Sequence, residues 1–575
     1  MLKMMKYLLR YWWQVILVIG FVVSQAFINL QLPDYMSQIV NDGVVQGDTS
    51  VIVNIGLKML GITFLGIIVS ALAGLFISRL AGAFSRDIRA DIFAKVESFS
   101  MGEFNKFSAA SLITRTTNDV QQVRMLLQMG RLIIMAPAMG VGALLKAISM
   151  APGMTWILGV SVGGLFILML IVFFISMPKF KKVQAFIDKI NLAARENLTG
   201  LRVIRAFNAE AVEEGKFTEA NKDLTKVNLF IGRLMALLQP AMSFVFQIVT
   251  IGVVWVGAML IDLGTLELGN MMAFINYAMH VMFSFMLVGM MFIMIPRASV
   301  SANRIKEVLE TKSSVNDPAS PISPASDLRG LVEFKNVSFG YPGAEDHVLK
   351  EINFTAGSGK TTAFIGSTGC GKSTLVNLIM RFYDVSEGEV LVDGVDVRQL
   401  LQKDLRGKIG YIPQKGTLFR GTVESNIKYG RESAEAEDIR EAAETAQALK
   451  FIEELEGGFS YKVAQGGSNV SGGQKQRLSI ARALVKKPEI YIFDDSFSAL
   501  DFKTDKALRA ALKERMSDAT VLIVAQRINT ILNADQIIVL DNGVIVGRGT
   551  HRELMKNCAV YQEIAYSQLS KEELA

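Results

Sequence analysis

The sequence is poor in cysteine and histidine, with two cysteines and three histidines among 575 residues. Cys370 lies in a glycine-rich loop and Cys558 lies near the C-terminus, so we expect no disulfide bond between them. Cys370 also occupies a variable position of its loop, and we assign it no chemistry. His551 is preceded by Thr550 and followed two residues later by Glu553, which is the spacing of a capping box. We therefore interpret His551 as part of a helix start and not as a metal ligand.

Charge is almost absent from several long stretches of the first 300 residues, in a chain that is 51% hydrophobic. A membrane-spanning helix needs about 20 largely apolar residues. Candidate spans lie at 11–32, 55–78, 130–150, 154–178, 235–261 and 270–296. No cleavage site follows the first stretch, so we predict a retained helix and not a signal peptide. The two segments 80–128 and 180–234 have helical spacing, and we expect them to extend the spans, with bends around 98–107 and 199–208.

Positive charge is missing from the loop after the first span, which carries Asp34, Asp42 and Asp48. The segments 80–128 and 180–234 are instead rich in arginine and lysine. By the positive-inside rule, both chain ends are predicted to be cytoplasmic, in a multi-pass protein of the cytoplasmic membrane. The excess of basic residues behind the net charge of +6 lies in the segments that are predicted to be cytoplasmic. It therefore gives no support for nucleic-acid binding.

Polar side chains within the spans are few, and Gln247, Asn276 and His280 are the candidates for function. Such groups also bond neighbouring helices, so both interpretations stay open. A row of methionines at helical spacing could contact apolar ligands, lipid or other helices. It consists of Met279, Met282, Met286, Met290 and Met294. An apolar, methionine-containing cavity favours a hydrophobic small molecule as substrate.

One glycine-rich stretch lies between an apolar run at 363–365 and a second apolar run at 375–380. It reads Gly366-Ser367-Thr368-Gly369-Cys370-Gly371-Lys372-Ser373-Thr374. The order strand, loop and helix is the context of the phosphate-binding pattern G-x-x-x-x-G-K-[ST]. Backbone N–H groups can surround phosphate oxygens there, Lys372 can reach the β- and γ-phosphates, and Ser373 can bind Mg²⁺. The sequence therefore predicts a site for a nucleoside triphosphate with Mg²⁺.

Three prolines interrupt the helical pattern at 312–327, which we interpret as a semi-rigid linker. We expect a transmembrane domain at 1–311 and an ATP-binding domain at 328–575. In the second domain strands alternate with helices, which predicts an α/β fold with a mostly parallel sheet. The expected strands are 331–338, 362–365, 409–412, 490–493 and 521–524.

Over essentially its whole length the chain resembles a half-transporter of the ATP-binding cassette (ABC) exporter family. Besides the phosphate loop, the resemblance rests on five short motifs in the order of the family. They are Phe339-Gly340-Tyr341, Ile412-Pro413-Gln414, Val470-Ser471-Gly472-Gly473-Gln474, Ile490-Tyr491-Ile492-Phe493-Asp494 and Ser498-Ala499-Leu500-Asp501. It implies an exporter-like (type IV) α-helical transmembrane domain of six spans with long cytoplasmic extensions, joined to an α/β P-loop ATP-binding domain.

The resemblance also implies roles for individual residues. Tyr341 would stack on adenine, Gln414 would lie near Mg²⁺ and the attacking water, and Asp494 would hold Mg²⁺ through water. Asp501 belongs to the D-loop. The signature residues Ser471, Gly472, Gly473 and Gln474 would meet ATP held by a second cassette, since two cassettes sandwich two ATP molecules in this family. The chain is therefore expected to work as part of a dimer in the lipid bilayer.

Two positions next to the γ-phosphate differ from the family pattern. Asp495 stands where an active member has glutamate, and Gln526 stands where it has histidine. Asp495 is one methylene shorter than glutamate, and Gln526 cannot be protonated, so we expect ATP binding with slow hydrolysis. General-base assistance contributes about 10²–10⁴ in rate. A third departure, Gln465 in place of a glutamate before the signature, has no assigned effect.

These departures, together with the intact signature, predict one subunit of a heterodimeric exporter of multidrug type. Its partner is expected to carry the glutamate and the histidine, and a degraded signature. Alternatives of the same fold are a lipid or peptide exporter and a siderophore-type importer. A further alternative is a regulatory membrane protein in which the cassette senses ATP without transport. The spans exclude a soluble ABC protein acting on ribosomes or DNA.

Overall fold

The computed structural model describes residues 2–323, 328–498 and 500–569. The chain forms two compact units, described separately below. The membrane unit comprises the chain up to Lys95 and the segment Ala110–Glu310. The cassette unit comprises the chain from Thr311 onward, together with the short segment Val96–Ala109.

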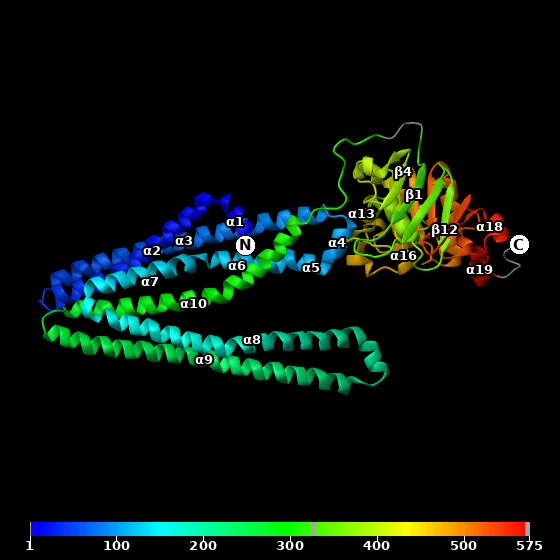
Figure 1. Cartoon of the computed structure of the whole chain (residues 1–575). Coiled ribbons are helices and arrows are strands. Elements are labelled where there is room, and N and C mark those ends of the chain that lie inside the picture. Colours follow the sequence, from blue (N-terminus) through cyan, green and yellow to red (C-terminus); the bar gives the residue numbers. More distant parts are fainter. Residues whose placement is uncertain (1, 324–327, 499, 570–575) are drawn as a thin grey trace. The chain divides into compact units, whose positions relative to one another are not determined.

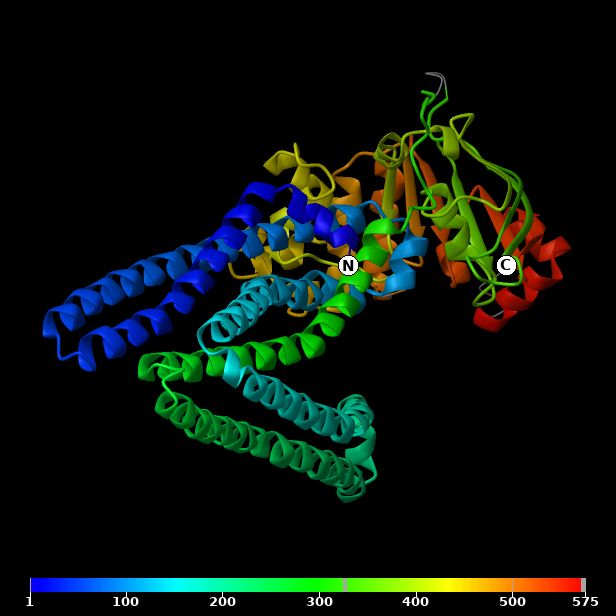
Figure 2. The same ribbon diagram turned by 60° about the vertical axis from the view of Figure 1, so that its left-hand side comes forward.

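The membrane unit is built from long helices (Figure 1). They are α1 (Leu2–Leu9), α2 (Trp12–Gln38), α3 (Thr49–Glu97), α5 (Ala109–Thr114), α6 (Val120–Gln128), α7 (Gly130–Met150), α8 (Thr155–Ala206), α9 (Glu210–Asp262) and α10 (Leu268–Glu310). Short π-helical segments at Ile39–Val44 and Arg115–Asp119 continue α2 and precede α6, and a 3-10 turn at Pro152–Met154 precedes α8. In Figures 1 and 2, α8 and α9 run side by side as an antiparallel pair.

Six helices in the described part of the chain are long and apolar enough to cross a membrane, which confirms the six predicted spans. Helices α8 and α9 contain 52 and 53 residues. At about 1.5 Å per residue, each is more than twice as long as the hydrocarbon core of a bilayer, which is about 30 Å thick. The predicted extensions of the spans are thus confirmed. Their bends lie between α3 and the short helix α4 (Met101–Phe107), and between α8 and α9.

Small and aromatic side chains fill the core of the membrane unit, where Ala143, Phe274 and Tyr277 are fully buried. Many large apolar side chains point outward instead, as expected for helices that face lipid. The predicted methionine row is not one surface, because Met279 is 45% exposed and Met282 is 5% exposed. Of the others, Met290 lies outside the described side chains.

The cassette unit contains two main sheets and a small one. The central sheet has the order β12-β11-β3-β10-β9-β6 and is parallel except for β12. The second sheet is antiparallel, with the order β2-β1-β4-β5, and β7 pairs with β8. The strands are β1 (Val332–Phe339), β2 (Leu349–Ala356), β3 (Thr361–Gly366), β4 (Glu387–Val392), β5 (Val395–Asp396), β6 (Ile409–Ile412), β7 (Gly421–Thr422), β8 (Lys462–Val463), β9 (Ile490–Asp494), β10 (Thr520–Val524), β11 (Gln536–Asp541) and β12 (Val544–Gly549).

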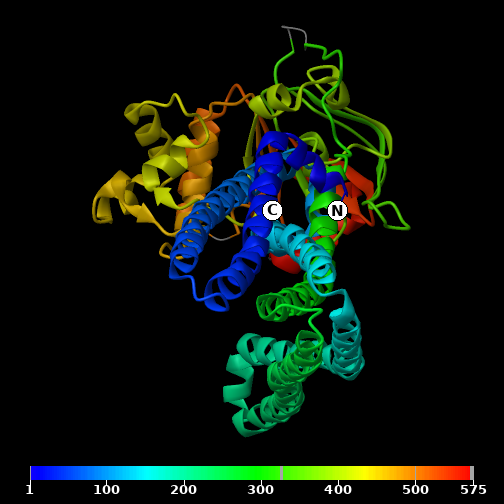
Figure 3. The same cartoon turned by 90° about the vertical axis from the view of Figure 1, so that its left-hand side faces the viewer.

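Helices pack around these sheets (Figure 3). They are α11 (Lys372–Ile379), α12 (Gln402–Gly407), α13 (Val423–Lys428), α14 (Ala436–Thr445), α15 (Leu449–Glu454), α16 (Gly472–Leu484), α17 (Phe502–Arg515), α18 (His551–Asn557) and α19 (Ala559–Gln568). At the start of α18 the Thr550 backbone N–H donates to Glu553 Oε2 at 2.7 Å, which confirms the predicted capping box. His551 Nδ1 lies 2.8 Å from the Tyr561 hydroxyl.

The α/β fold of the cassette unit agrees with the prediction, and one strand does not lie where we expected it. Strands β9 and β10 are buried at every residue, because helices cover both faces of the parallel sheet. The expected strand at 331–338 is β1, which belongs to the antiparallel sheet and not to the parallel one. Its two neighbours, β2 and β4, come from segments in which no strand was predicted.

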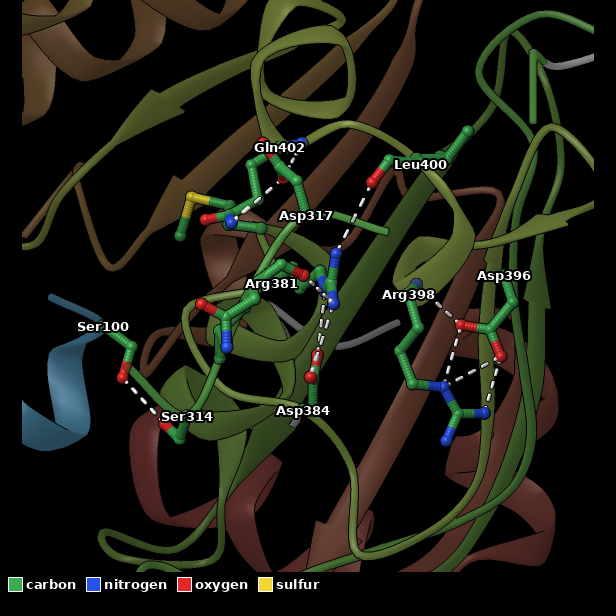
Figure 4. A network of polar contacts seen from close by, with 12 residues as sticks. Ser100, Ser314, Asp317, Arg381, Asp384, Asp396, Arg398, Leu400 and Gln402 are labelled. Carbon is green, nitrogen blue, oxygen red and sulfur yellow. Dashed lines mark hydrogen bonds and ion pairs between the residues drawn. The ribbon is translucent and has the colours of Figure 1, made fainter. Parts of the chain in front are cut away.

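The start of the predicted linker lies against the cassette (Figure 4). Arg381, which is 4% exposed, donates to the backbone oxygens of Asn316 and Leu400 and to the Asp384 carboxylate. Asp317 accepts from the backbone and side-chain nitrogens of Gln402. The described linker residues are therefore held in place, while the predicted stretch 324–327 lies outside the described residues.

Helix α4 belongs to the cassette unit although it lies in the sequence between membrane helices. Ser100, just before α4, is 2.9 Å from the Ser314 hydroxyl (Figure 4). Glu103 accepts from the Ser314 backbone N–H at 3.2 Å, and Asn105 donates to the Tyr383 hydroxyl at 3.2 Å. The predicted bend at 98–107 is thus a contact point for the cassette.

Candidate active site

The glycine-rich loop begins where β3 ends, at Gly366, and leads into α11. The φ angles of Gly366, Gly369 and Gly371 are 155°, 86° and 101°, a region that side chains rarely adopt. A Cβ atom at Gly366 would lie 2.0 Å from the Leu540 backbone oxygen. Glycine is therefore required at the base of the loop, both for its backbone angle and for the space that it leaves.

Lys372 bends back over this loop and is 8% exposed. Its Nζ donates to the backbone oxygens of Gly366 at 2.8 Å and Ser367 at 2.7 Å. The segment Ser367–Gly369 is exposed, whereas Cys370 is buried. An ammonium group beside exposed backbone N–H groups at a helix N-terminus attracts phosphate oxygens. The loop thus offers a fixed positive charge inside an accessible backbone cradle.

Asp494 ends β9 directly beside the loop. The Ser373 hydroxyl donates to Asp494 Oδ1 at 2.9 Å, and the Tyr411 hydroxyl lies 3.5 Å from Asp494 Oδ2. Burial raises the pKa of the Asp494 carboxyl, the charge of Asp495 adds to this rise, and the Ser373 hydrogen bond opposes it. A hydroxyl and a carboxylate are the oxygen donors that Mg²⁺ prefers. Among the described residues no cluster of three or more His, Cys, Asp or Glu could hold a metal alone, so an ion here needs phosphate or water ligands as well.

Asp495 is the centre of a second polar group. Its backbone has a φ of 48°, and its backbone N–H donates to the Val524 oxygen at 2.9 Å. Asp495 Oδ2 accepts two side-chain amides, from Gln414 at 3.0 Å and from Gln526 at 2.9 Å. Burial raises the pKa of the Asp495 carboxyl, while the Gln414 amide and the charge of Lys372 oppose the rise. The structure thus brings together Gln414, expected near the attacking water, and the two residues expected next to the γ-phosphate, Asp495 and Gln526.

Tyr341 is half-buried next to α11, and its hydroxyl lies 2.9 Å from Thr374 Oγ1. Its ring packs edge-on against Tyr383, with the ring centroids 5.3 Å apart. The Tyr383 hydroxyl in turn accepts from Asn105 of α4. Sequence reasoning missed Tyr383, although it lies only three residues beyond Met380, the last residue of the apolar run that follows the loop. It connects the aromatic residue expected at the adenine to α4.

The signature residues lie at the exposed start of α16, and none of the hydrogen bonds described for them reaches the Asp495 group. Ser471 caps this helix, accepting from the Gln474 backbone N–H, while Gln474 Oε1 accepts from the Ser471 backbone N–H at 2.9 Å. Ser471 and Gly472 are exposed, and Gly473 and Gln474 are partly exposed. The helix end is therefore available to another molecule.

Asp501 caps α17 by accepting from the Thr504 backbone N–H at 2.9 Å. Its predicted D-loop neighbour Ala499 lies outside the described residues.

Gln476, on the same helix as the signature, is 1% exposed and was also missed by sequence reasoning. Its amide nitrogen donates to the Pro413 oxygen at 3.0 Å, and its amide oxygen accepts from the Gly416 backbone N–H at 3.0 Å. These two bonds hold the chain on both sides of Gln414. The loop that supplies an amide to Asp495 is thus fixed to the helix that presents the signature.

Comparison with known proteins agrees with this geometry. Residues 15–286 match the family model described as ABC transporter transmembrane region, and residues 349–498 match the model described as ABC transporter. An uncharacterized ABC transporter ATP-binding protein of Mycobacterium tuberculosis is 41% identical over 544 residues, which cover 94% of this chain and 93% of that protein. A protein of Bacillus subtilis with the same description is 33% identical over 552 residues, or 96% of this chain and 95% of that one.

An ATP-dependent lipid A-core flippase of Desulfotalea psychrophila is 31% identical over 498 residues, or 85% of each chain. Among solved structures, a bacterial Atm1-family ABC exporter with ATP bound superposes with a TM-score of 0.79 at 25% identity. That match covers 98% of this chain and 99% of the other. The chain therefore belongs to the ABC transporters, and it is an ATP-hydrolysing transporter with the fold of an Atm1-family exporter.

Proposed function

We propose that this chain is one subunit of a heterodimeric exporter that moves a hydrophobic or amphipathic substrate out across the cytoplasmic membrane. In this proposal its own ATP site hydrolyses slowly, and its signature helix completes a faster site on the partner. Both chain ends and the cassette face the cytoplasm, in keeping with the arginine- and lysine-rich segments 80–128 and 180–234.

The phosphate loop from Gly366 to Thr374 binds the phosphates of ATP, with Lys372 as the point charge on the β- and γ-phosphates. Tyr341 stacks on adenine, for which its hydroxyl must leave Thr374 or its ring must turn. Ser373, Asp494 and Gln414 would hold Mg²⁺, which would supply positive charge to the phosphates when bound. The hydroxyl and carboxylate pair at 2.9 Å supports this assignment.

The observation that carries the proposal is the pair of amides on Asp495. In a fast site the residue at this position polarises the attacking water, and an imidazole at position 526 contacts the γ-phosphate. Here the shorter Asp495 is held by Gln414 and by Gln526, which has no titrating proton to contribute. Water activation is therefore weak, and ATP binding is left intact.

The exposure of the signature residues supports a role at an ATP site other than the chain's own. A helix of 13 residues whose first turn exposes Ser471 and Gly472 can meet a γ-phosphate on a second cassette. In the proposed heterodimer that cassette carries glutamate and histidine at the positions of Asp495 and Gln526, and its own signature is degraded. ATP closure of the two cassettes is transmitted to the spans through α4 and through the turn between α8 and α9, at the end of the predicted bend 199–208.

The test is phosphate release from the purified full-length chain, alone and co-purified with its partner subunit. We expect ATP binding in both samples. Turnover should be at least about 10²-fold higher for the complex with the partner, because the chain's own site lacks general-base assistance. Lys372→Ala in this chain serves as a control for ATP binding. Rapid turnover by the chain alone would exclude the degenerate site, and unchanged turnover with the partner would exclude the shared site.

A further inference from the structure

Two arginines of the membrane unit lie on one face of the continuous segment formed by α6 and α7. Arg124 and Arg131 are seven residues apart, and Met129 between the helices keeps helical backbone angles. Seven residues of α-helix make two turns to within about 20°, so the two side chains leave the same face about 10 Å apart. We call these residues the arginine pair.

Neither arginine of the pair has a carboxylate partner among the described residues. Arg131 Nη2 donates to Gln25 Oε1 and to Ser70 Oγ, each at 2.8 Å, and both acceptors are neutral. Arg124 Nε is buried and has no hydrogen-bond partner within the part of the chain that the structure describes. Asp119 lies on another face of the helix, because five residues correspond to a rotation of about 140°. Its Oδ1 accepts from Ser301, while its Oδ2 is buried and has no partner among the described residues, the two arginines included.

The surrounding sequence contains no carboxylate that could reach the arginine pair from the helices that Arg131 contacts. No aspartate or glutamate occurs at 12–33 of α2, at 49–86 of α3 or at 120–150 of α6 and α7. A buried guanidinium N–H without a hydrogen bond costs more free energy than a buried neutral N–H without one, because the charge is desolvated as well. No carboxylate of these stretches neutralises the arginine pair, and the hydrogen bonds described for it go only to the neutral groups of Gln25 and Ser70.

The depth of the arginine pair places it at one boundary of the membrane. Helix α7 ends at Met150, and Arg131 is 19 residues before this end, or about 28 Å along the helix axis. The hydrocarbon core is about 30 Å thick. With the proposed topology, Arg131 lies at the level of the inner-leaflet headgroups, and Arg124 lies about two turns further toward the cytoplasm.

We propose that the arginine pair binds the phosphate headgroup of an anionic amphiphile that enters from the inner leaflet. A guanidinium offers a planar fork of donors that matches phosphate oxygens, and the two long side chains can converge on one headgroup. The apolar tail would remain against the lipid-facing helices. This assignment rests on the proposed export function and narrows its substrate to phosphate-bearing amphiphiles.

The experiment measures binding to the full-length chain, co-purified with its partner and reconstituted in phosphatidylcholine nanodiscs without ATP. Two phosphate probes distinguish the source of the ligand: phosphatidic acid placed in the nanodisc, and dodecyl phosphate added from solution. Diacylglycerol and dodecanol are the matched neutral probes. The variants are Arg124→Gln, Arg131→Gln and Arg131→Lys, with Arg86→Gln as the control. Arg86 is an exposed arginine already paired with Asp87, so its loss removes the same charge from elsewhere.

We expect Arg124→Gln and Arg131→Gln each to weaken phosphate binding about tenfold or more, as for loss of a charged hydrogen bond. Arg131→Lys should recover part of the affinity, whereas Arg86→Gln and the neutral probes should show no change. Arg124→Gln keeps the test decisive if Arg131→Gln fails to fold, because Arg124 has no hydrogen bond at Nε to lose. Equal phosphate affinity in the wild type and both glutamine variants would overturn the proposal. Because no ATP is present, this result is independent of whether the ATP-site proposal holds.

Discussion

Restoring the two departures at the γ-phosphate should convert this chain into an active ATPase by itself. The variants are Asp495→Glu, Gln526→His and the double mutant, each in the full-length chain without a partner. A pair of copies contains two intact signatures, so the departures next to the γ-phosphate are those at positions 495 and 526. The experiment therefore isolates the two groups that the degenerate-site proposal holds responsible.

The expected magnitudes follow from the bonds to Asp495. Its Oδ2 is engaged by Gln414 at 3.0 Å and Gln526 at 2.9 Å, and a charged hydrogen bond contributes about 1.5–3 kcal/mol. Glutamate adds one C–C bond, about 1.5 Å of reach, yet the Gln526 amide still competes for it. We expect Asp495→Glu to raise turnover about tenfold and Gln526→His to raise it less than about threefold. Both increases are smaller than the rate factor of about 10²–10⁴ that complete general-base assistance contributes.

The double mutant should gain about 10²–10³-fold, more than the product of the single changes, because the two residues share a hydrogen bond. The assay is phosphate release at saturating ATP, with Lys372→Ala in the double-mutant background as the control for contaminating ATPases. Two outcomes would refute the reasoning: a wild-type chain that already matches the double mutant, or a double mutant that binds ATP without any gain in turnover.

Three other substitutions test the supports of the site. Gln476→Met should leave the Pro413 oxygen and the Gly416 N–H unpaired, at a cost of about 1–3 kcal/mol each. It should therefore lower the turnover of the complex with the partner more than it lowers ATP affinity. Gln399→Met, at an exposed glutamine, is the control, and an unchanged turnover of Gln476→Met would contradict the role. Tyr383→Phe should remove the bond to Asn105 and reduce coupling of ATP use to transport in vesicles while ATP binding stays within about twofold, since the ring packing is kept. Gly366→Ala should abolish nucleotide binding in a fluorescent-ATP assay, because the added Cβ would lie 2.0 Å from the Leu540 oxygen; normal binding would show that the loop can shift.

Of the five parallel strands described in the central sheet, β3, β6, β9 and β10 could be predicted almost to the residue, whereas β11 was missed although it too is a buried apolar run. Strands β6, β9 and β10 are continuous apolar runs, because helices cover both faces of the sheet, and such runs stand out in a sequence. Strand β2 alternates buried and exposed residues, and β12 is nowhere fully buried. Their weaker patterns were missed, and with them the antiparallel sheet that contains β1.

The phosphate loop could also be predicted, because glycines at a fixed spacing indicate a backbone conformation that does not depend on the rest of the fold. Asp494 could be predicted because it ends an apolar run. Gln476 and Tyr383 could not be recognised in the same way. Their importance comes from bonds to Pro413, Gly416 and Asn105, which lie 60 to 278 positions away in the sequence. A single glutamine or tyrosine has no local signature for such a partner.

The arginine pair shows the same limit inside the membrane unit. Arg131 lies at the start of the predicted span 130–150. From the sequence it cannot be distinguished from an ordinary basic residue that flanks a span according to the positive-inside rule. What distinguishes it is its setting, since its described hydrogen bonds go only to Gln25 and Ser70, and Arg124 has a buried N–H without a partner. A charge that only balances topology can remain hydrated at the interface, whereas these two are partly desolvated without being neutralised. An anionic ligand that enters and leaves during transport accounts for both the partial burial of the two arginines and the lack of a carboxylate partner. A permanent carboxylate at this place would pair with the arginines and so compete with the ligand.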